Sequence, residues 1–314
     1  MKSIIKSWVP FFVKNILLKV YLFFLKYSTK YISSQDFWNK NIVDSPKNGF
    51  RDIKSSLNHL EWRNNQYIDS IGHMKMKQLT NKVVLDYGCG PGNDIVNINQ
   101  LSKPKKLIAI DVSEYAINLA KKRVKLHKLK VDFIKINEKE KIKDISHKSI
   151  DIIQCNGVLH HIDDLAFVFQ EFSRILKDNG KIRIMVYNKN SIWFHLHVAY
   201  EMKVKKKIWT DLSLDELFSK TTDGFNCPIS KCYEPENFIN ICNKYKFKAN
   251  LVGISISLFE MSKLSLMWEA QKSKFLDIKS INFLKQIEFN KRGIPYYKKN
   301  VAGINSYFEL TKLR

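Results

Sequence analysis

The 314-residue chain has little arginine and little cysteine, and both shortages argue against whole classes of protein. Only seven of its 53 basic residues are arginine, although the formal net charge is +23. Phosphate recognition favours arginine, whose guanidinium forms two parallel hydrogen bonds, so a solvated lysine-rich surface explains the charge better than a nucleic-acid site does. The five cysteines are odd in number and include no C-x-x-C pair, which argues against a zinc ribbon and a secreted disulfide framework. We therefore expect reduced thiols in a cytoplasmic protein.

The N-terminus lacks an uncharged apolar run long enough to cross a membrane. Residues 8–25 are mostly apolar, yet Lys14 and Lys19 interrupt them, and a spanning helix needs about 18–20 residues with few or no charges. No acid precedes Asp36, and several lysines fall on one narrow strip of the helix. This pattern predicts that residues 1–35 form a basic, hydrophobic helix. It would lie in an anionic membrane interface at the inner face of the membrane, or pack on the protein itself or in a dimer seam. A true membrane span is the remaining alternative.

What the chain does have is a glycine-rich turn between two apolar strands. Residues 83–85 are typical of a buried strand, and Asp86 closes it. The turn that follows has glycine at three alternate positions: Gly88, Gly90 and Gly92. Glycine there lets the backbone adopt positive φ and approach a ligand closely. A second apolar run, residues 107–110, ends in Asp111. The whole unit predicts a nucleoside site at the carboxyl ends of parallel strands.

The spacing of this turn favours one kind of nucleoside. The dinucleotide fingerprint is G-x-G-x-x-G, whereas here the third glycine comes one residue early and Asn93 stands in its place. Asp86 would repel a pyrophosphate but suits a cationic amino-acid headgroup. The D-x-G-x-G-x-G form, followed by Asp111, resembles motif I of the class I S-adenosylmethionine-dependent methyltransferases. The resemblance implies S-adenosylmethionine as the cofactor.

The rest of the chain continues the resemblance. Strands are expected at residues 131–136, 149–156, 181–187, 249–259 and 304–312, with helices at 53–71 and 167–176 and a helix stop at Asn179-Gly180. The implied fold is α/β, a Rossmann-like seven-stranded methyltransferase sheet with helices on both faces and a final antiparallel hairpin. The expected segments are an N-terminal helix (1–35), the cofactor-binding core (36–190), an inserted substrate lid (191–246), and C-terminal core strands with a helical insertion (247–314).

The resemblance also implies which residues hold the cofactor. Asp86 and the backbone of residues 88–92 would hold the amino-acid moiety, Asp111 the ribose hydroxyls and Asn137 the adenine amine, while Asn156 and Gly157 would line the pocket beside the sulfonium. The full expected set is Asp86, Tyr87, Gly88, Cys89, Gly90, Gly92, Asp111, Val112, Asn137, Asn156 and Gly157.

Three residues are candidates for contact with the reacting groups: His160, His161 and Tyr187. Histidine titrates near neutrality, and the pair follows the fourth strand, where the methyl group should emerge. A role for the pair in shaping the loop stays open. The neighbouring Asp163 and Asp164 could suggest a metal site, but contiguous side chains point in different directions, so we expect helix capping by an aspartate and no metal.

These observations predict a methyltransferase whose acceptor is a small molecule, a lipid or a glycan intermediate at the membrane surface, with O-methylation favoured over C-methylation. The alternatives are an RNA-modifying methyltransferase and a catalytically inactive S-adenosylmethionine-binding adaptor. The N/D-P-P-Y/F loop of enzymes that methylate amino groups of nucleic acids is missing, because residues 155–158 read C-N-G-V. The pattern makes no prediction about the oligomeric state.

Overall fold

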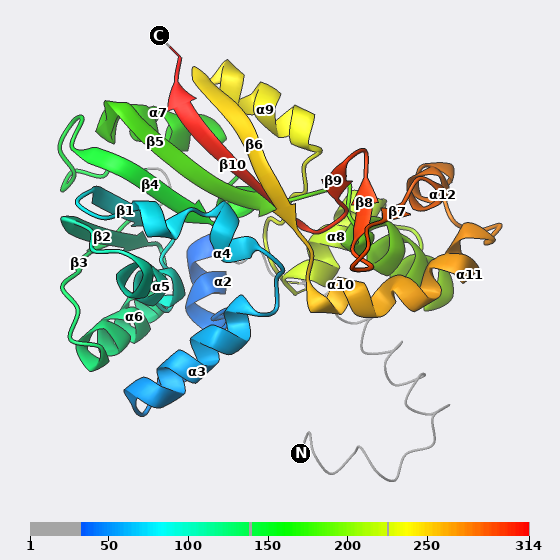
Figure 1. Ribbon diagram of the computed structural model, residues 1–314, viewed down its shortest axis with the longest axis horizontal. Helices are drawn as coiled ribbons and strands as arrows, with labels where there is room; N and C mark the ends of the chain where they lie inside the picture. The colour runs from blue at the N-terminus through cyan, green and yellow to red at the C-terminus, as the bar shows by residue number, and fades with distance from the viewer. Residues whose placement is uncertain (1–32, 138–139, 225, 314) are drawn as a thin grey trace.

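A computed structural model describes residues 33–137, 140–224 and 226–313 (Figure 1). The predicted N-terminal helix therefore lies outside the described residues, apart from residues 33–35. Helix α2 (Ser34–Lys40) begins there, and the Ser33 side chain caps it by accepting from the backbone N–H of Asp36. Within the described part of the chain, no helix is both long and apolar enough to cross a bilayer.

The centre of the molecule is a seven-stranded sheet with the order β3-β2-β1-β4-β5-β10-β6. Its strands are β1 (Val83–Tyr87), β2 (Lys106–Asp111), β3 (Asp132–Lys135), β4 (Ile150–Asn156), β5 (Leu176–Tyr187), β6 (Phe247–Ser255) and β10 (Asn305–Lys312). Strands β1 to β5 pair in parallel, while β10 runs antiparallel to both β5 and β6. The predicted Rossmann-like sheet with its final antiparallel hairpin is confirmed.

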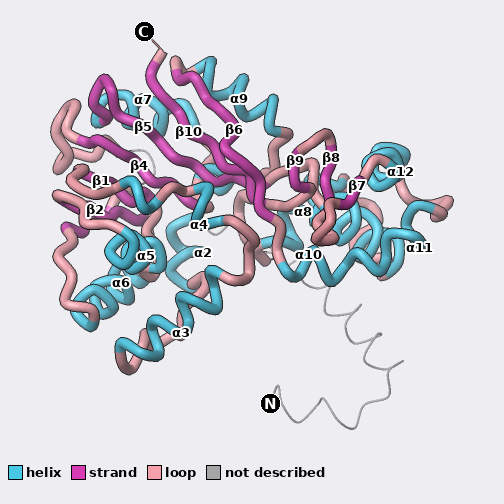
Figure 2. Tube along the Cα trace, in the orientation of Figure 1, coloured by secondary structure: helices cyan, strands magenta, loops and turns pink. Residues whose placement is uncertain are grey.

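Helices cover both faces of this sheet (Figure 2). On one face α5 (Asn93–Leu101) and α6 (Glu114–Leu126) pack on apolar residues of β1 and β2. On the other, α7 (Leu165–Ile175) and α9 (Pro235–Lys244) bury phenylalanines against β4, β5 and β6. Residues of β1 and β2 are buried almost throughout, as expected for parallel strands covered on both sides. Helix α9, which the sequence placed in the lid segment, thus belongs to a layer of the core.

Two helix boundaries differ from the prediction. Helix α7 ends at Ile175, one residue before the predicted end, but the predicted stop at Asn179-Gly180 is wrong because both residues lie within β5. The last carbonyls of α7 accept from the loop N–H groups of residues 148 and 149, and the chain then turns directly into β5. Its N-terminus is capped by Asp164, as expected, at 3.2 Å from the N–H of Phe167. The helix predicted over 53–71 is α3 (Ile53–Asn64) followed by a separate α4 (Ser70–His73), because the intervening Asp69 adopts φ +61°.

The remaining segments build an appendage at the β5–β10–β6 end of the sheet (Figure 1). It consists of a π-helix η3 (Trp193–Lys205), helices α8 (Leu214–Thr222), α10 (Leu258–Lys263), α11 (Met267–Gln271) and α12 (Ile278–Lys285), and a small sheet of β7 (Glu288–Phe289), β8 (Pro295–Tyr297) and β9 (Asn300–Val301). Two apolar clusters of its own hold it together. The appendage therefore forms a separate group of helices beside the sheet that carries the predicted cofactor site.

The join between the appendage and the core depends on Gly303. An added Cβ there would lie 2.1 Å from the carbonyl oxygen of Ser255, and backbone atoms cannot move aside as side-chain ends do. We predict that Gly303→Ala lowers the free energy of unfolding by about 1–3 kcal/mol or more, the usual cost of overpacking. Gly72→Ala is the matched control, because no atom lies within 4 Å of its added Cβ. Equal urea midpoints for the two variants would contradict this account.

Candidate functional site

A cavity of about 260 Å³ lies at the carboxyl ends of β1, β2 and β4. Helices α2 and α3, which precede the sheet in the chain, also contribute residues to its wall. Most of the residues expected from the sequence line it, namely Asp86, Tyr87, Gly88, Cys89, Gly90, Asp111, Val112, Asn156, Gly157, His161 and Tyr187. Three expected residues, Gly92, Asn137 and His160, are not part of the wall.

The glycine turn lets the backbone pass close to its neighbours. Gly88 adopts φ +78°, and an added Cβ would lie only 2.3 Å from Cγ2 of Val158. Gly92 adopts φ +83° at the start of α5, and its added Cβ would meet Ala120 of α6 at 3.3 Å. Gly92 therefore lets α5 approach α6, while Gly88 shapes the floor of the cavity.

Asp111 is held in place by the backbone. One carboxylate oxygen accepts from the N–H of Gly90 and the other from the N–H of Ser113, each at 2.8 Å. Burial raises the pKa of this carboxyl, and the backbone donors oppose the rise. The backbone N–H of Val112 also acts on this carboxylate. A carboxylate can accept about four hydrogen bonds, so with three backbone donors Asp111 can still accept from a ribose hydroxyl.

Asp86 lies in an environment that disfavours its negative charge. Its side chain is 2% exposed, and one carboxylate oxygen, Oδ2, has no hydrogen-bond partner. Burial raises its pKa well above the ordinary value, and the carboxylates of Asp94 and Asp111 raise it further, against the guanidinium of Arg63. A buried carboxylate without a partner is costly. The cavity is therefore short of positive charge, which suits a cationic ligand and disfavours a pyrophosphate.

Two residues of this cluster were not predicted as ligands. Asp94, in the first turn of α5, accepts from the side-chain amide of Asn156 at 2.8 Å. The Arg63 guanidinium of α3 lies 3.5 Å from Asp94 and 3.2 Å from Asp44. The carbonyl oxygen of the Asn156 side chain has no partner. Asp94 could have been suspected from its place two residues after the glycine turn, whereas nothing in the sequence placed Arg63 opposite it.

Asn137 and His160 lie elsewhere than expected. Strand β3 ends at Lys135, and Ile136 lines the cavity while Asn137 is exposed. The ring of His160 is fully buried, stacks on the Tyr187 ring at 3.8 Å, and neither ring nitrogen has a hydrogen-bond partner. Burial, and then the neighbouring His161, hold its pKa well below the ordinary value. In this structure His160 packs the loop, which is the role that the sequence left open for the pair.

His161 differs from its neighbour because its ring faces the cavity. It ends a short 3₁₀ turn (Leu159–His161), and its Nδ1 lies 2.7 Å from the carbonyl oxygen of Ile229. Because a carbonyl only accepts, Nδ1 carries the proton. Burial lowers the pKa of the imidazole, and the Asp223 carboxylate opposes this. The neutral ring thus keeps a free lone pair on Nε2, which lies 3.9 Å from Asp223.

Asp223 follows α8 and is itself held by two donors. The Tyr187 hydroxyl donates to one carboxylate oxygen at 2.9 Å and the Ser230 hydroxyl to the other at 2.6 Å. Burial, and then Asp223, raise the pKa of Tyr187 well above its ordinary value. Tyr187 therefore stays protonated and orients Asp223, and it is not a base.

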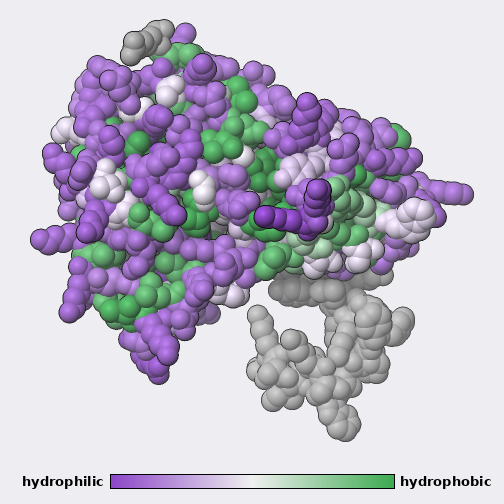
Figure 3. Space-filling view, viewed as in Figure 1, coloured by the Kyte–Doolittle hydropathy of each residue, from purple (hydrophilic) through white to green (hydrophobic). Residues whose placement is uncertain are grey.

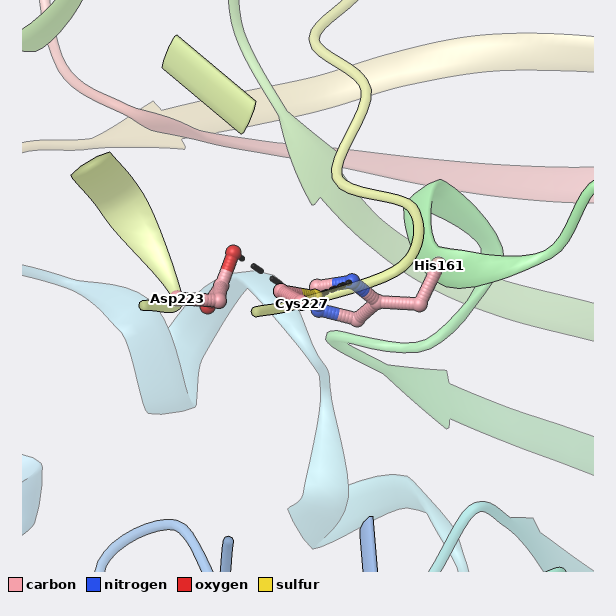
Figure 4. Close-up of side chains that lie close together, drawn as sticks. All are labelled: His161, Asp223 and Cys227. Carbon is pink, nitrogen blue, oxygen red and sulfur yellow. Dashed lines mark hydrogen bonds and ion pairs between the residues drawn. The ribbon is translucent and has the colours of Figure 1, made fainter. Parts of the chain in front are cut away.

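Figure 4 shows that the side chains of His161, Asp223 and Cys227 lie close together. Their ligand atoms lie within 4.8 Å of one another, close enough to hold a metal ion. The Cys227 thiol, however, donates to the carbonyl oxygen of Ile229 at 3.3 Å, and burial raises its pKa to about 12. A metal could bind the free Nε2 of His161, but it would have to displace the thiol proton of Cys227. The hydrogen bonds thus favour a role in positioning His161 over metal ligation.

Comparison with known proteins agrees with this geometry. Residues 79–231 match the family model of a methyltransferase domain. The chain carries a class I S-adenosylmethionine-dependent methyltransferase domain. The cofactor of this methyltransferase domain is S-adenosylmethionine, and its charge fits the cavity: an ammonium group and a sulfonium can offset Asp86 and its acidic neighbours. Arg63 can pair with the carboxylate of the cofactor, and Asp111 can accept a hydrogen bond from its ribose.

The methyltransferase domain has relatives of several kinds. The chain is 30% identical over 161 residues to "Ubiquinone biosynthesis O-methyltransferase" of Pelagibacter ubique, covering 50% of this chain and 61% of that protein. It is 30% identical over 124 residues to the protein of the same name from Nitrosomonas europaea, covering 40% and 50%. The match thus spans between half and two thirds of the length of these relatives. It is also 29% identical over 142 residues to "Arsenite methyltransferase" of Mus musculus, covering 42% and 36%.

Solved structures resemble the chain more loosely. A SAM-dependent methyltransferase from Aquifex aeolicus is 25% identical, with 40% of this chain and 68% of that one covered and a TM-score of 0.36. The YcgJ protein from Bacillus subtilis is 13% identical, with 78% and 98% covered and a TM-score of 0.49.

Proposed function

We propose that the protein transfers a methyl group from S-adenosylmethionine to a hydroxyl group of a small, largely apolar acceptor. The observation that carries this proposal is the neutral His161 ring, which lines the cavity and keeps a free lone pair on Nε2, because its Nδ1 is held by a backbone carbonyl. An imidazole held in this way can accept the proton that an acceptor hydroxyl loses.

The mechanism divides the work between two ends of the cavity. Bound S-adenosylmethionine supplies an electrophilic methyl group. Asp86, Arg63 and Asp111 would hold the cofactor. Correct orientation of two reactants can lower the activation barrier by up to roughly 7–11 kcal/mol. At the other end, Nε2 of His161 takes the hydroxyl proton. The Asp223 carboxylate, 3.9 Å away, stabilises the resulting imidazolium, and the Tyr187 hydroxyl keeps that carboxylate in place.

The walls of the cavity support an apolar acceptor. Beside the polar groups named above, it is lined by Trp38, Ile42, Val43, Ile136, Val158, Ile162 and Met185. The Trp38 ring of α2 packs edge-on against His161 at 4.8 Å. The printed names of the two bacterial relatives support a small-molecule acceptor and transfer to oxygen. The sequence pattern of residues 1–35 supports an acceptor held at the inner face of the membrane.

The proposal predicts a specific pH dependence. The pKa of His161 is lowered by burial from its ordinary value near 6.5, so the ring is neutral, and active as a base, at pH 7. We expect the rate of S-adenosylhomocysteine release, with a lipid extract as the acceptor pool, to be level above pH 7. It should fall as the pH drops through a pKa below 6.5. RNA in place of the extract should give no release. A rate that rises only in the alkaline range would contradict the role of His161.

A further inference from the structure

The appendage exposes large apolar side chains close together in the chain. Trp268 is 69% exposed, Phe275 86% and Ile278 66%, and all three lie within eleven residues. They belong to α11, to the start of α12 and to the loop between these two helices, which pack on each other. Single exposed apolar residues are common on soluble proteins, but a group of them marks an interaction site.

The charges around this group are positive. The Lys272 ammonium lies 3.7 Å from the centroid of the Trp268 ring. Within the described residues, Lys274 and Lys279 form no ion pair. The nearby acids are already engaged: Glu269 pairs with Lys205 at 2.7 Å, and the Asp277 side chain caps α12. Aromatic side chains flanked by unpaired lysines are typical of proteins that rest on an anionic lipid surface.

The preceding helix, α10, also exposes apolar side chains, and it begins near the cavity. Leu258 and Phe259, at the start of α10, are 48% and 42% exposed, and Lys263 lies 4.5 Å from the Phe259 ring centroid. The N–H of Leu258 donates to the carbonyl oxygen of Gln66 at 2.9 Å, and the next residue, Tyr67, lines the cavity. Figure 3 shows pale and green residues beside purple ones over α10 and α11.

We propose that this apolar face docks on an anionic lipid bilayer. The docking face is formed by Leu258, Phe259, Trp268, Phe275 and Ile278, with Lys272, Lys274 and Lys279 placed to contact lipid phosphates. It is separate from residues 1–35 and would give the protein a second membrane contact, next to the wall of the cavity that Tyr67 forms. Docking needs neither cofactor nor turnover, so it can be tested independently of the proposed reaction.

Vesicle sedimentation of the full chain tests the docking face. Phosphatidylcholine vesicles with phosphatidylglycerol should bind the protein, and phosphatidylcholine alone should bind it weakly. In the variant Trp268→Ser/Phe275→Ser, affinity for the anionic vesicles should fall by roughly tenfold or more, since burying each ring contributes substantially. The control Trp62→Ser removes a ring that is 54% exposed on α3 and should bind as the unchanged protein does.

A second variant separates charge from apolar contact. Lys274→Gln/Lys279→Gln should lose about thirtyfold in affinity for the anionic vesicles, because each lysine near an anionic surface contributes about 1 kcal/mol. Unchanged vesicle binding by both double variants would overturn the proposal, since residues 1–35 would then suffice. Unchanged vesicle binding together with loss of self-association in the ring variant would overturn it too, and would assign the face to a second copy of the chain.

Discussion

Replacing His161 by Asn is expected to lower the rate of methyl transfer by about 10²–10⁴-fold, the usual contribution of a positioned general base. The asparagine amide can still donate to the carbonyl oxygen of Ile229, which His161 Nδ1 meets at 2.7 Å, but it has no nitrogen that accepts a proton. Affinity for S-adenosylmethionine should stay the same, because the cofactor groups lie at the Asp86 end of the cavity. Methyl transfer into a lipid extract and calorimetry with the cofactor measure the two effects.

The neighbouring histidine provides the matched control. His160→Phe keeps the aromatic stack on Tyr187 and removes two ring nitrogens that have no partner, so the rate should change little. The same rate loss in both variants would show that the pair acts only by shaping the loop. Loss of activity on dialysis against a chelator, restored by a divalent metal, would instead assign His161, Asp223 and Cys227 to a metal site.

The second large effect is expected at Gly88. Gly88→Ala places a Cβ 2.3 Å from Val158 on a backbone with φ +78°. A left-handed backbone costs about 1–2 kcal/mol for other residues, and overpacking adds about 1–3 kcal/mol. The turn should move, so affinity for S-adenosylmethionine falls by at least about tenfold and the free energy of unfolding falls by about 2–5 kcal/mol. Calorimetry and urea denaturation measure these changes.

Two further variants separate the cost of the left-handed backbone from the cost of the steric clash with Val158. Gly293→Ala has φ +73° and no atom within 4 Å of the added Cβ, so it should show only the backbone cost and bind the cofactor normally. Val158→Ala should restore part of the loss when combined with Gly88→Ala, because two of the three colliding atoms are removed. If Gly88→Ala binds S-adenosylmethionine as tightly as Gly293→Ala does, the turn is not the floor of the cofactor site.

The sequence was sufficient for the parts of the site that are local in the chain. Asp86, the glycine turn and Asp111 lie within two adjacent strand–turn units, so their spacing predicts a nucleoside site. The family resemblance that they carry implies the fold and the cofactor. The parallel strands follow from continuous apolar runs that are buried on both sides. The final antiparallel strand came from the order of elements in the resembled family.

The rest of the site depends on contacts between distant segments. Arg63 reaches Asp94 from a helix 31 residues earlier in the chain, and no local pattern indicates such a pairing. His160 and His161 are adjacent, yet one is buried in packing and the other faces the cavity, because the 3₁₀ turn points their rings in different directions. The carbonyl that fixes the tautomer of His161 belongs to Ile229, 68 residues away. Asn137 was placed by analogy, and it lies one residue past the position that lines the cavity.

Isothermal titration calorimetry of the purified full chain tests the central claim most directly. We expect S-adenosylmethionine to bind at one site and NADH to give no heat, because Asp86, whose Oδ2 has no hydrogen-bond partner, attracts the cationic donor and repels a diphosphate. In Asp111→Ala the affinity should fall at least about tenfold, since hydrogen bonds to a charged group contribute about 1.5–3 kcal/mol each. A clean NADH isotherm with no heat from S-adenosylmethionine would contradict the account.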